Sequence, residues 1–139
     1  MFETVVVGAD GSPTAAEAVR QAIDLVKLTG GSLHIVSAYT PHSLTTPGSE
    51  FGKSLASDAV AQSVLDDLAS RASIAGVEVT VHPRAGSPAD AICEVAADVK
   101  ADLVVVGNKG MTGARRILGS VPNSVAHQAP CSVLIAATT

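Results

Sequence analysis

The chain has 139 residues, of which 47% are hydrophobic and only 2% aromatic, and its formal net charge is −4. This length predicts a single domain over residues 1–139, with a core of Val, Ala, Leu and Ile. The negative charge and the lack of Trp argue against a nucleic-acid-binding protein, because such proteins need a basic face or aromatic platforms for the bases.

The N-terminal residues show neither the basic region nor the apolar span of a secretion signal. No apolar run in the sequence approaches the ~18 residues that a membrane helix requires. Cys93 and Cys131 stand in apolar patterns, and we expect them in the core of a protein from a reducing compartment. The sequence therefore predicts a cytoplasmic protein with no membrane partner.

The N-terminal part of the chain predicts a strand, a helix and a second strand. The apolar run Thr4–Gly8 is typical of a buried strand. Ser12 can cap a helix, and Pro13 suits its first turn. This helix should end at the glycine pair 30–31, and residues 32–38 follow as the second strand.

The middle of the chain predicts a long loop, a helix and an edge strand. Residues 39–52 contain two prolines and two glycines without any periodic pattern, which is typical of a long loop with a possible role as a lid. Residues 53–75 return to a helical period, with Leu55 and Ala59 among the expected buried positions. Residues 77–81 alternate like a strand at the edge of a sheet.

The C-terminal part predicts two further helices and two further strands. Ser87 and Asp90 form a Ser-x-x-Asp capping box at the start of a third helix. Four apolar residues and a glycine at 103–107 predict a buried strand. A final helix over roughly residues 120–128 precedes a fifth strand at 132–136.

Five strands that alternate with four helices predict a doubly wound α/β fold, with a parallel sheet in the order 3-2-1-4-5. In this order the chain reverses direction between the strands at 4–8 and 103–107. A ligand should bind at the carboxyl ends of these two strands. Asp10 follows the first of them, and a glycine-rich loop follows the second, so both features should face one crevice.

The glycine-rich loop has the composition of a phosphate-binding segment. Gly107, Gly110 and Gly113 allow close approach of backbone N–H groups to an anion, because they carry no Cβ. Gly119-Ser120 adds a hydroxyl and the unpaired N–H donors of a helix start. A tight turn with a purely structural role is the alternative interpretation.

This loop resembles the nucleotide loop G-x2-G-x9-G-[ST] of the universal stress protein family. Gly107, Gly110 and Gly119-Ser120 match the pattern, except that eight residues instead of nine separate the second and third glycines. Residues 121–123 and 129–136 also resemble the family, so the resemblance covers essentially the whole chain. It implies a Rossmann-like fold of the adenine nucleotide alpha hydrolase type.

The resemblance further implies that ATP or another adenine nucleotide binds in the crevice. Asp10 would contact the ribose, the backbone at Ser37 and Ala38 would hold the adenine, and Val106 and Val121 would pack near the base. The full set of expected binding residues is Ala9, Asp10, Ser37, Ala38, Val106, Gly107, Lys109, Gly110, Arg115, Gly119, Ser120, Val121 and Pro122.

Two alternatives remain open for the charged members of this set. Asp10 also fits a simple turn residue that satisfies the backbone before Ser12. Lys109 and Arg115 either neutralise phosphates or are solvated side chains of a surface loop. The sequence alone does not decide between these roles.

The sequence assigns no catalytic residue. Phosphoryl transfer requires a base or water-positioning group and a carboxylate that holds a metal, and Asp10 is the only acidic residue that the topology places in the crevice. The histidines show no metal-ligand spacing. We therefore expect hydrolysis to be slow or absent, and any Mg²⁺ to be held mainly by the oxygens of the nucleotide.

The sequence thus predicts an ATP-binding regulatory module of the stress response. The alternatives are a relative that binds AMP or cyclic AMP, a slow ATPase or adenylating enzyme, and a protein-interaction module without a nucleotide. The apolar strand 132–136 should lie at the outside of the sheet, where uncovered backbone groups invite another chain. Both this edge and the resemblance predict a homodimer through that strand.

Overall fold

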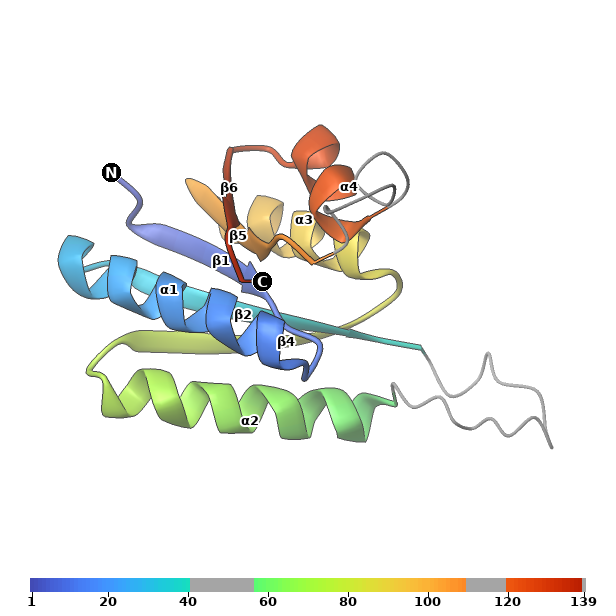
Figure 1. Ribbon diagram of the computed structural model, residues 1–139, viewed down its shortest axis with the longest axis horizontal. Helices are drawn as coiled ribbons and strands as arrows, with labels where there is room; N and C mark the ends of the chain where they lie inside the picture. Colours follow the sequence, from blue (N-terminus) through green and yellow to red (C-terminus); the bar gives the residue numbers. More distant parts are fainter. Residues whose placement is uncertain (41–56, 110–119, 139) are drawn as a thin grey trace, which may run out of the picture.

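The computed structural model describes residues 1–40, 57–109 and 120–138. In these ranges the strands are β1 (Thr4–Gly8), β2 (Ser32–Tyr39), β4 (Glu78–Ala85), β5 (Leu103–Gly107) and β6 (Ser132–Ala136). The helices are α1 (Pro13–Thr29), α2 (Asp58–Ile74), α3 (Pro88–Asp98) and α4 (Val121–Gln128). The strands form a parallel sheet in the order β4-β2-β1-β5-β6, which confirms the predicted order 3-2-1-4-5. Helices α1 and α2 cover one face of this sheet, and α3 and α4 cover the other (Figure 1).

The central strands are apolar along their length because both of their faces are buried. On β1, Val5 and Val7 pack with residues of α1 and α2, whereas Val6 packs with residues of α3 and α4. All three side chains have 0% exposure. Strand side chains alternate between the two faces, so one sheet supports two separate cores.

Every helix in the described ranges begins after a capping serine. Ser12, Ser57, Ser87 and Ser120 each accept a hydrogen bond from the backbone N–H three residues further on. Each bond satisfies a donor that the first turn of a helix otherwise leaves unpaired. The helix starts predicted at Ser12, Ser87 and Ser120 are confirmed. None of these helices is long and apolar enough to cross a membrane.

The predicted start of the second helix is wrong. Helix α2 begins at Asp58 because Ser57, in an extended conformation, caps it. Ala59 is exposed, and Ala61 takes its place in the buried stripe. Leu55 and most of the predicted loop lie outside the described residues, in the range 41–56.

Two other predictions need correction. Strand β4 does lie at the sheet edge, but it continues past residue 81 to Ala85. It includes Pro83, whose missing N–H is tolerated on an edge strand.

Cys93 and Cys131 are free thiols that are only half-buried at the rim of the α3–α4 core, so they are not core residues.

Asp102, just before β5, fastens the start of β1 to the neighbouring strand. Its carboxylate accepts hydrogen bonds from the backbone N–H groups of Glu3 and Thr4, both at 3.1 Å, and its own N–H donates to the Thr4 carbonyl at 3.0 Å. Burial raises the pKa of Asp102, but the hydrogen bonds from Glu3 and Thr4 outweigh it and hold the pKa below its ordinary value of 3.8. The folded state therefore favours the ionised carboxylate.

We expect Asp102→Ala to lower the free energy of unfolding by about 1–2 kcal/mol at pH 7, because two backbone donors lose a charged acceptor. Asp66→Ala, at an exposed position of α2, should change it by less than about 0.5 kcal/mol. Because the folded pKa of Asp102 is lowered, its contribution is present above the unfolded pKa and disappears as the pH falls through the folded value. Urea unfolding of both variants from pH 7 to pH 2 measures this. If the free energies of unfolding of Asp102→Ala and the unmodified protein differed by the same amount at every pH in this range, the ionised Asp102 carboxylate would not be the stabilising group.

Candidate functional site

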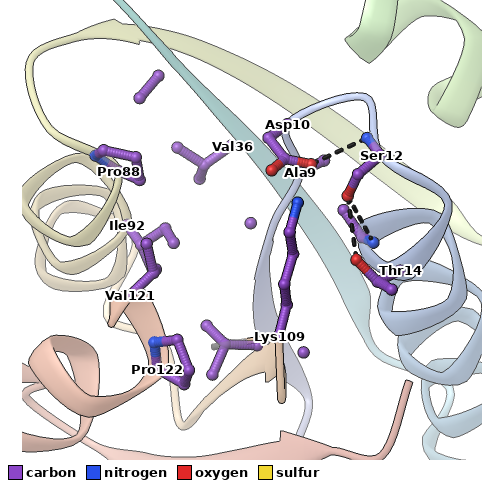
Figure 2. A pocket seen from close by; sticks show the side chains of 15 residues that line it. Ala9, Asp10, Ser12, Thr14, Val36, Pro88, Ile92, Lys109, Val121 and Pro122 are labelled. Carbon is purple, nitrogen blue, oxygen red and sulfur yellow. Dashed lines mark hydrogen bonds between the residues drawn. The ribbon is translucent and has the colours of Figure 1, made fainter. Parts of the chain in front are cut away.

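A cavity of about 150 Å³ opens at the carboxyl ends of β1 and β5, in the crevice predicted from the strand order. It is enclosed by the start of α1, strand β2, and the starts of α3 and α4 (Figure 2). The expected binding residues that line it are Ala9, Asp10, Ala38, Val106, Gly107, Lys109, Val121 and Pro122. Residues from both ends of the chain therefore meet at this point.

One wall of the cavity is apolar. Val36 and Ala38 contribute from β2, Ile92 from α3 and Val106 from β5. Gly8 leaves room for Ile92, because a Cβ at this position would force the end of the Ile92 side chain to move. The close approach of β1 and α3 thus gives a smooth apolar surface, which is suited to a flat ring.

The rim next to α1 is polar and held by local hydrogen bonds. The Asp10 carboxylate accepts a hydrogen bond from the Ser12 backbone N–H at 2.9 Å. The Ser12 hydroxyl accepts from the Ala15 N–H and shares a further bond with the Thr14 hydroxyl, both at 3.1 Å (Figure 2). Asp10 therefore has the turn role that was one of its two predicted roles, and its carboxylate is fixed at the mouth of the cavity.

Lys109 brings a positive charge to the same rim. Its exposed side chain extends from the end of β5 and turns toward Asp10 (Figure 2). Burial raises the pKa of Asp10, but hydrogen bonds from Ser12 and the charge of Lys109 outweigh this and lower the pKa below its ordinary value. Among the residues that the structure describes, the rim therefore carries the Asp10 carboxylate and the Lys109 ammonium group.

The C-terminal segment fixes the start of the glycine-rich loop. The Asn108 side-chain oxygen accepts hydrogen bonds from the Thr138 backbone N–H at 3.0 Å and from its hydroxyl at 2.9 Å. A Cβ at Gly107 would lie 3.1 Å from the Thr138 hydroxyl oxygen, so a larger residue would require a small shift of the Thr138 side chain. The loop therefore leaves β5 from an anchored position.

The remaining expected residues do not line the cavity or lie outside the described residues. Ser37 is buried at 3% exposure between Val36 and Ala38, and its side chain belongs to the opposite face of the sheet. Ser120 caps α4 by accepting a hydrogen bond from the Asn123 N–H at 3.3 Å. The expected residues outside the described ranges are Gly110, Arg115 and Gly119.

Several lining residues were missed by the sequence analysis: Gly8, Ser12, Thr14, Ala15, Val36, Pro88 and Ile92. Two signals could have revealed some of them. Val36 shares the Ala38 face of β2 by simple alternation. Pro88 begins a helix with the same Ser-Pro step as α1, and in a parallel sheet these helix starts lie at the same edge.

Comparison with known proteins supplies the family. Residues 1–137 match the model of the Universal stress protein family. The chain belongs to this family. It is 39% identical over 144 aligned residues to the universal stress protein Rv1636 of Mycobacterium tuberculosis, an alignment that covers 99% of this chain and 98% of that protein. It is 31% identical to the universal stress protein MJ0531 of Methanocaldococcus jannaschii, with 97% and 82% covered.

Solved structures of the family share the fold. A universal stress protein in complex with cAMP superposes with a TM-score of 0.82 at 37% identity, covering 99% of this chain and 98% of that one. A universal stress protein from Archaeoglobus fulgidus gives a TM-score of 0.72 at 25% identity, with 97% and 93% covered. The Rossmann-like α/β fold predicted for this universal stress protein is therefore confirmed.

The electrostatic pairing at the rim can be tested directly. We expect Lys109→Met to raise the pKa of Asp10, because a positive charge that favours the carboxylate is removed. Lys27→Met, in the last turn of α1, should leave this pKa unchanged. NMR titration of the Asp10 carboxyl carbon measures both. An Asp10 pKa that is the same in all three proteins would show that Lys109 does not act on it.

Proposed function

We propose that this universal stress protein binds an adenine nucleotide in the cavity between β1 and β5 and acts as a cytoplasmic regulatory module. The observation that carries the proposal is the composition of the cavity. A smooth apolar wall faces a rim with one carboxylate and one ammonium group, at the reversal point of a doubly wound sheet. An adenine nucleotide combines a flat base, a sugar with hydroxyl groups and a phosphate, and each part has a complementary region here.

In this proposal the base lies against the apolar wall, between Ala38 and Ile92. The ribose hydroxyls donate hydrogen bonds to Asp10. The phosphate lies toward Lys109 and the start of α4, which is the positive end of the helix dipole. The relative that was solved with cAMP supports the adenine class, because it shares 37% of its residues and nearly its whole length with this chain.

Two nucleotides remain as candidates. ATP is the one predicted from the glycine pattern, in which the segment between Gly107 and Ser120 carries a triphosphate. Cyclic AMP is the second, and two observations favour it: the ligand of the 37%-identical relative and the segment between the second and third glycines, which is one residue shorter than the family pattern. A shorter loop offers fewer backbone donors and suits a single phosphate.

Two measurements separate these candidates. Mass spectrometry of the small molecules released by denaturing freshly purified protein identifies any nucleotide that copurifies. Calorimetric titration of nucleotide-free protein with ATP, AMP and cAMP then gives their relative affinities. ATP binding that is at least tenfold tighter than cAMP binding supports the first candidate, and the reverse order supports the second. No binding of any of the three would favour the protein-interaction module.

The role of Asp10 can be separated from its role in the turn. Asp10→Asn keeps an acceptor for the Ser12 N–H but presents an amide in place of the carboxylate. We expect it to weaken nucleotide binding by about 1–3 kcal/mol, which is the contribution of a hydrogen bond to a charged group. Asp24→Asn, on the exposed face of α1, is the control and should leave affinity unchanged. Calorimetry that gives the same affinity for Asp10→Asn and the unmodified protein would leave Asp10 with its turn role alone.

The same cavity could also belong to a slow ATPase or an adenylating enzyme. Among the described residues that line the cavity, Asp10 is the one carboxylate, and it is already engaged with Ser12. Phosphoryl transfer also needs a group that positions the nucleophile. We therefore propose a binding protein in which Mg²⁺, if present, is held through the phosphates. Phosphate or AMP release that Asp10→Asn abolishes would favour the enzyme instead.

We also propose that the protein forms a homodimer through β6. This strand lies at the sheet edge, and its Leu134 and Ile135 side chains are 43% and 37% exposed. An apolar edge strand without Lys or Pro leaves backbone groups that can pair with another chain. Pairing with the same strand of a second copy about a two-fold axis would cover both edges.

We expect Leu134→Lys to shift the protein from dimer to monomer, because a charge is placed in an apolar, self-complementary contact. Leu28→Lys is the matched control: Leu28 is even more exposed, at 86%, but lies in the last turn of α1. Light scattering at micromolar concentration gives the mass of all three proteins. A monomeric mass for the unmodified protein would refute the dimer.

A further inference from the structure

Two histidines contact each other near the edge of the sheet that lies opposite β6. The Nδ1 atom of His34, on β2, lies 2.9 Å from the Nε2 atom of His82, on the edge strand β4. Their ring centroids are 5.1 Å apart, and the rings are tilted by 35°. Both side chains are half-buried, and neither lines the cavity at β1 and β5.

The parallel pairing of β2 and β4 brings the two rings together. His34 pairs in register with Thr80, and His82 pairs with Val36. The histidines are therefore diagonal neighbours on one face of the sheet, a spacing that long side chains can bridge. Their contact follows from the register of two strands and not from a flexible loop.

Charges of both signs lie near the pair. Glu78 lies close enough to act electrostatically on His34, and Asp98 acts on His82 from α3. Arg84, the cation of this group, is itself paired with Asp98 at 3.1 Å and with Glu94 at 3.9 Å. Two carboxylates therefore offset the charge of Arg84, and Glu78 adds a negative charge near His34.

The imidazoles are also held in the neutral form that a metal requires. Burial lowers the pKa of His34 despite the nearby carboxylate of Glu78. Burial lowers the pKa of His82 as well, with further lowering by the charges of His34 and Arg84. Two neutral imidazoles in hydrogen-bond contact share one proton, with one nitrogen as donor and the other as acceptor.

We propose that His34 and His82 form a binding site for a divalent late first-row transition metal, Ni²⁺ or Cu²⁺; as the metal binds, the proton between the rings moves to the other nitrogen of the donor imidazole. Imidazole nitrogens bind such ions at about 2.0–2.1 Å, so two ligands at about 90° lie about 2.9 Å apart. The observed separation matches this cis arrangement of tetragonal sites. A tetrahedral Zn²⁺ site would need about 3.4 Å.

The metal needs only a small change in the protein. Both rings are partly exposed, and metal binding requires them to rotate so that their nitrogen lone pairs point to a common position. Among the described residues, no group of three or more His, Cys, Asp and Glu side chains is arranged around a metal. Water therefore completes the coordination, as is common for open sites.

Titration of the full-length, untagged and nucleotide-free protein with Ni²⁺ at pH 7.5 tests the proposal. We expect one ion per chain. His34→Gln and His82→Gln should each lower the affinity at least tenfold, because a single imidazole remains. His127→Gln, which removes an exposed histidine on α4, is the matched control and should bind as the unmodified protein does. Nucleotide binding, measured in the same variants, should not change.

Two further readouts keep the result independent of folding. Ni²⁺ should raise the melting temperature of the unmodified protein and of His127→Gln, but not that of the pair variants. Binding should also weaken as the pH falls, because protons compete for the same nitrogens. Equal Ni²⁺ affinity in the double variant His34→Gln/His82→Gln, or an equal loss in His127→Gln, would overturn the site. The site would also be overturned if the His34→Gln or His82→Gln variant were unfolded without metal but still bound one ion after refolding with Ni²⁺.

Discussion

The position of β1 between β2 and β5 is the constraint on which the rest of the structure depends. Val5, Val6 and Val7 are completely buried, and each pairs in parallel register with a neighbouring strand. A strand covered on both faces and on both sides can contribute to a ligand site at its ends, where its backbone groups are no longer paired. In β1 this end lies beyond Gly8, where the strands that flank β1 connect to helices on opposite faces (Figure 1).

The local sequence and the tertiary contacts contribute different parts of the site. Serine caps and early prolines fix where α1, α3 and α4 begin, so their N-terminal ends meet at the carboxyl edge of the sheet. The apolar wall depends instead on long-range packing, since the end of the Ile92 side chain occupies the space that a side chain at Gly8 would need. The turn that holds Asp10 is thus determined locally, whereas the wall is determined by the fold.

This difference explains what the sequence could predict. Strand order and the starts of α1, α3 and α4 follow from short patterns with a physical cause, and they were predicted correctly. Ile92 and Val36 were missed, because their place at the cavity depends on which helix crosses which strand. The contact of His34 with His82 also depends on strand register, which hydrophobic alternation alone does not specify for an edge strand. Ser57 was missed as the cap of α2 because an apolar helical period extends upstream of it.

The direction of the β2 backbone bears on how an adenine base would be held under the proposed function. The Val36 carbonyl accepts a hydrogen bond from the Ala9 N–H at 2.8 Å, so the polar backbone groups of residue 36 face β1. Because these groups alternate along a parallel strand, those of Ser37 face β4 and those of Ala38 face β1 again. The pairing of β1 with β2 ends at Gly8 and Val36, where the cavity begins. Of the two residues expected to hold the base, Ala38 is therefore the one whose backbone groups are directed to the crevice. A wall that recognises the base through main-chain groups needs no polar side chain at this position.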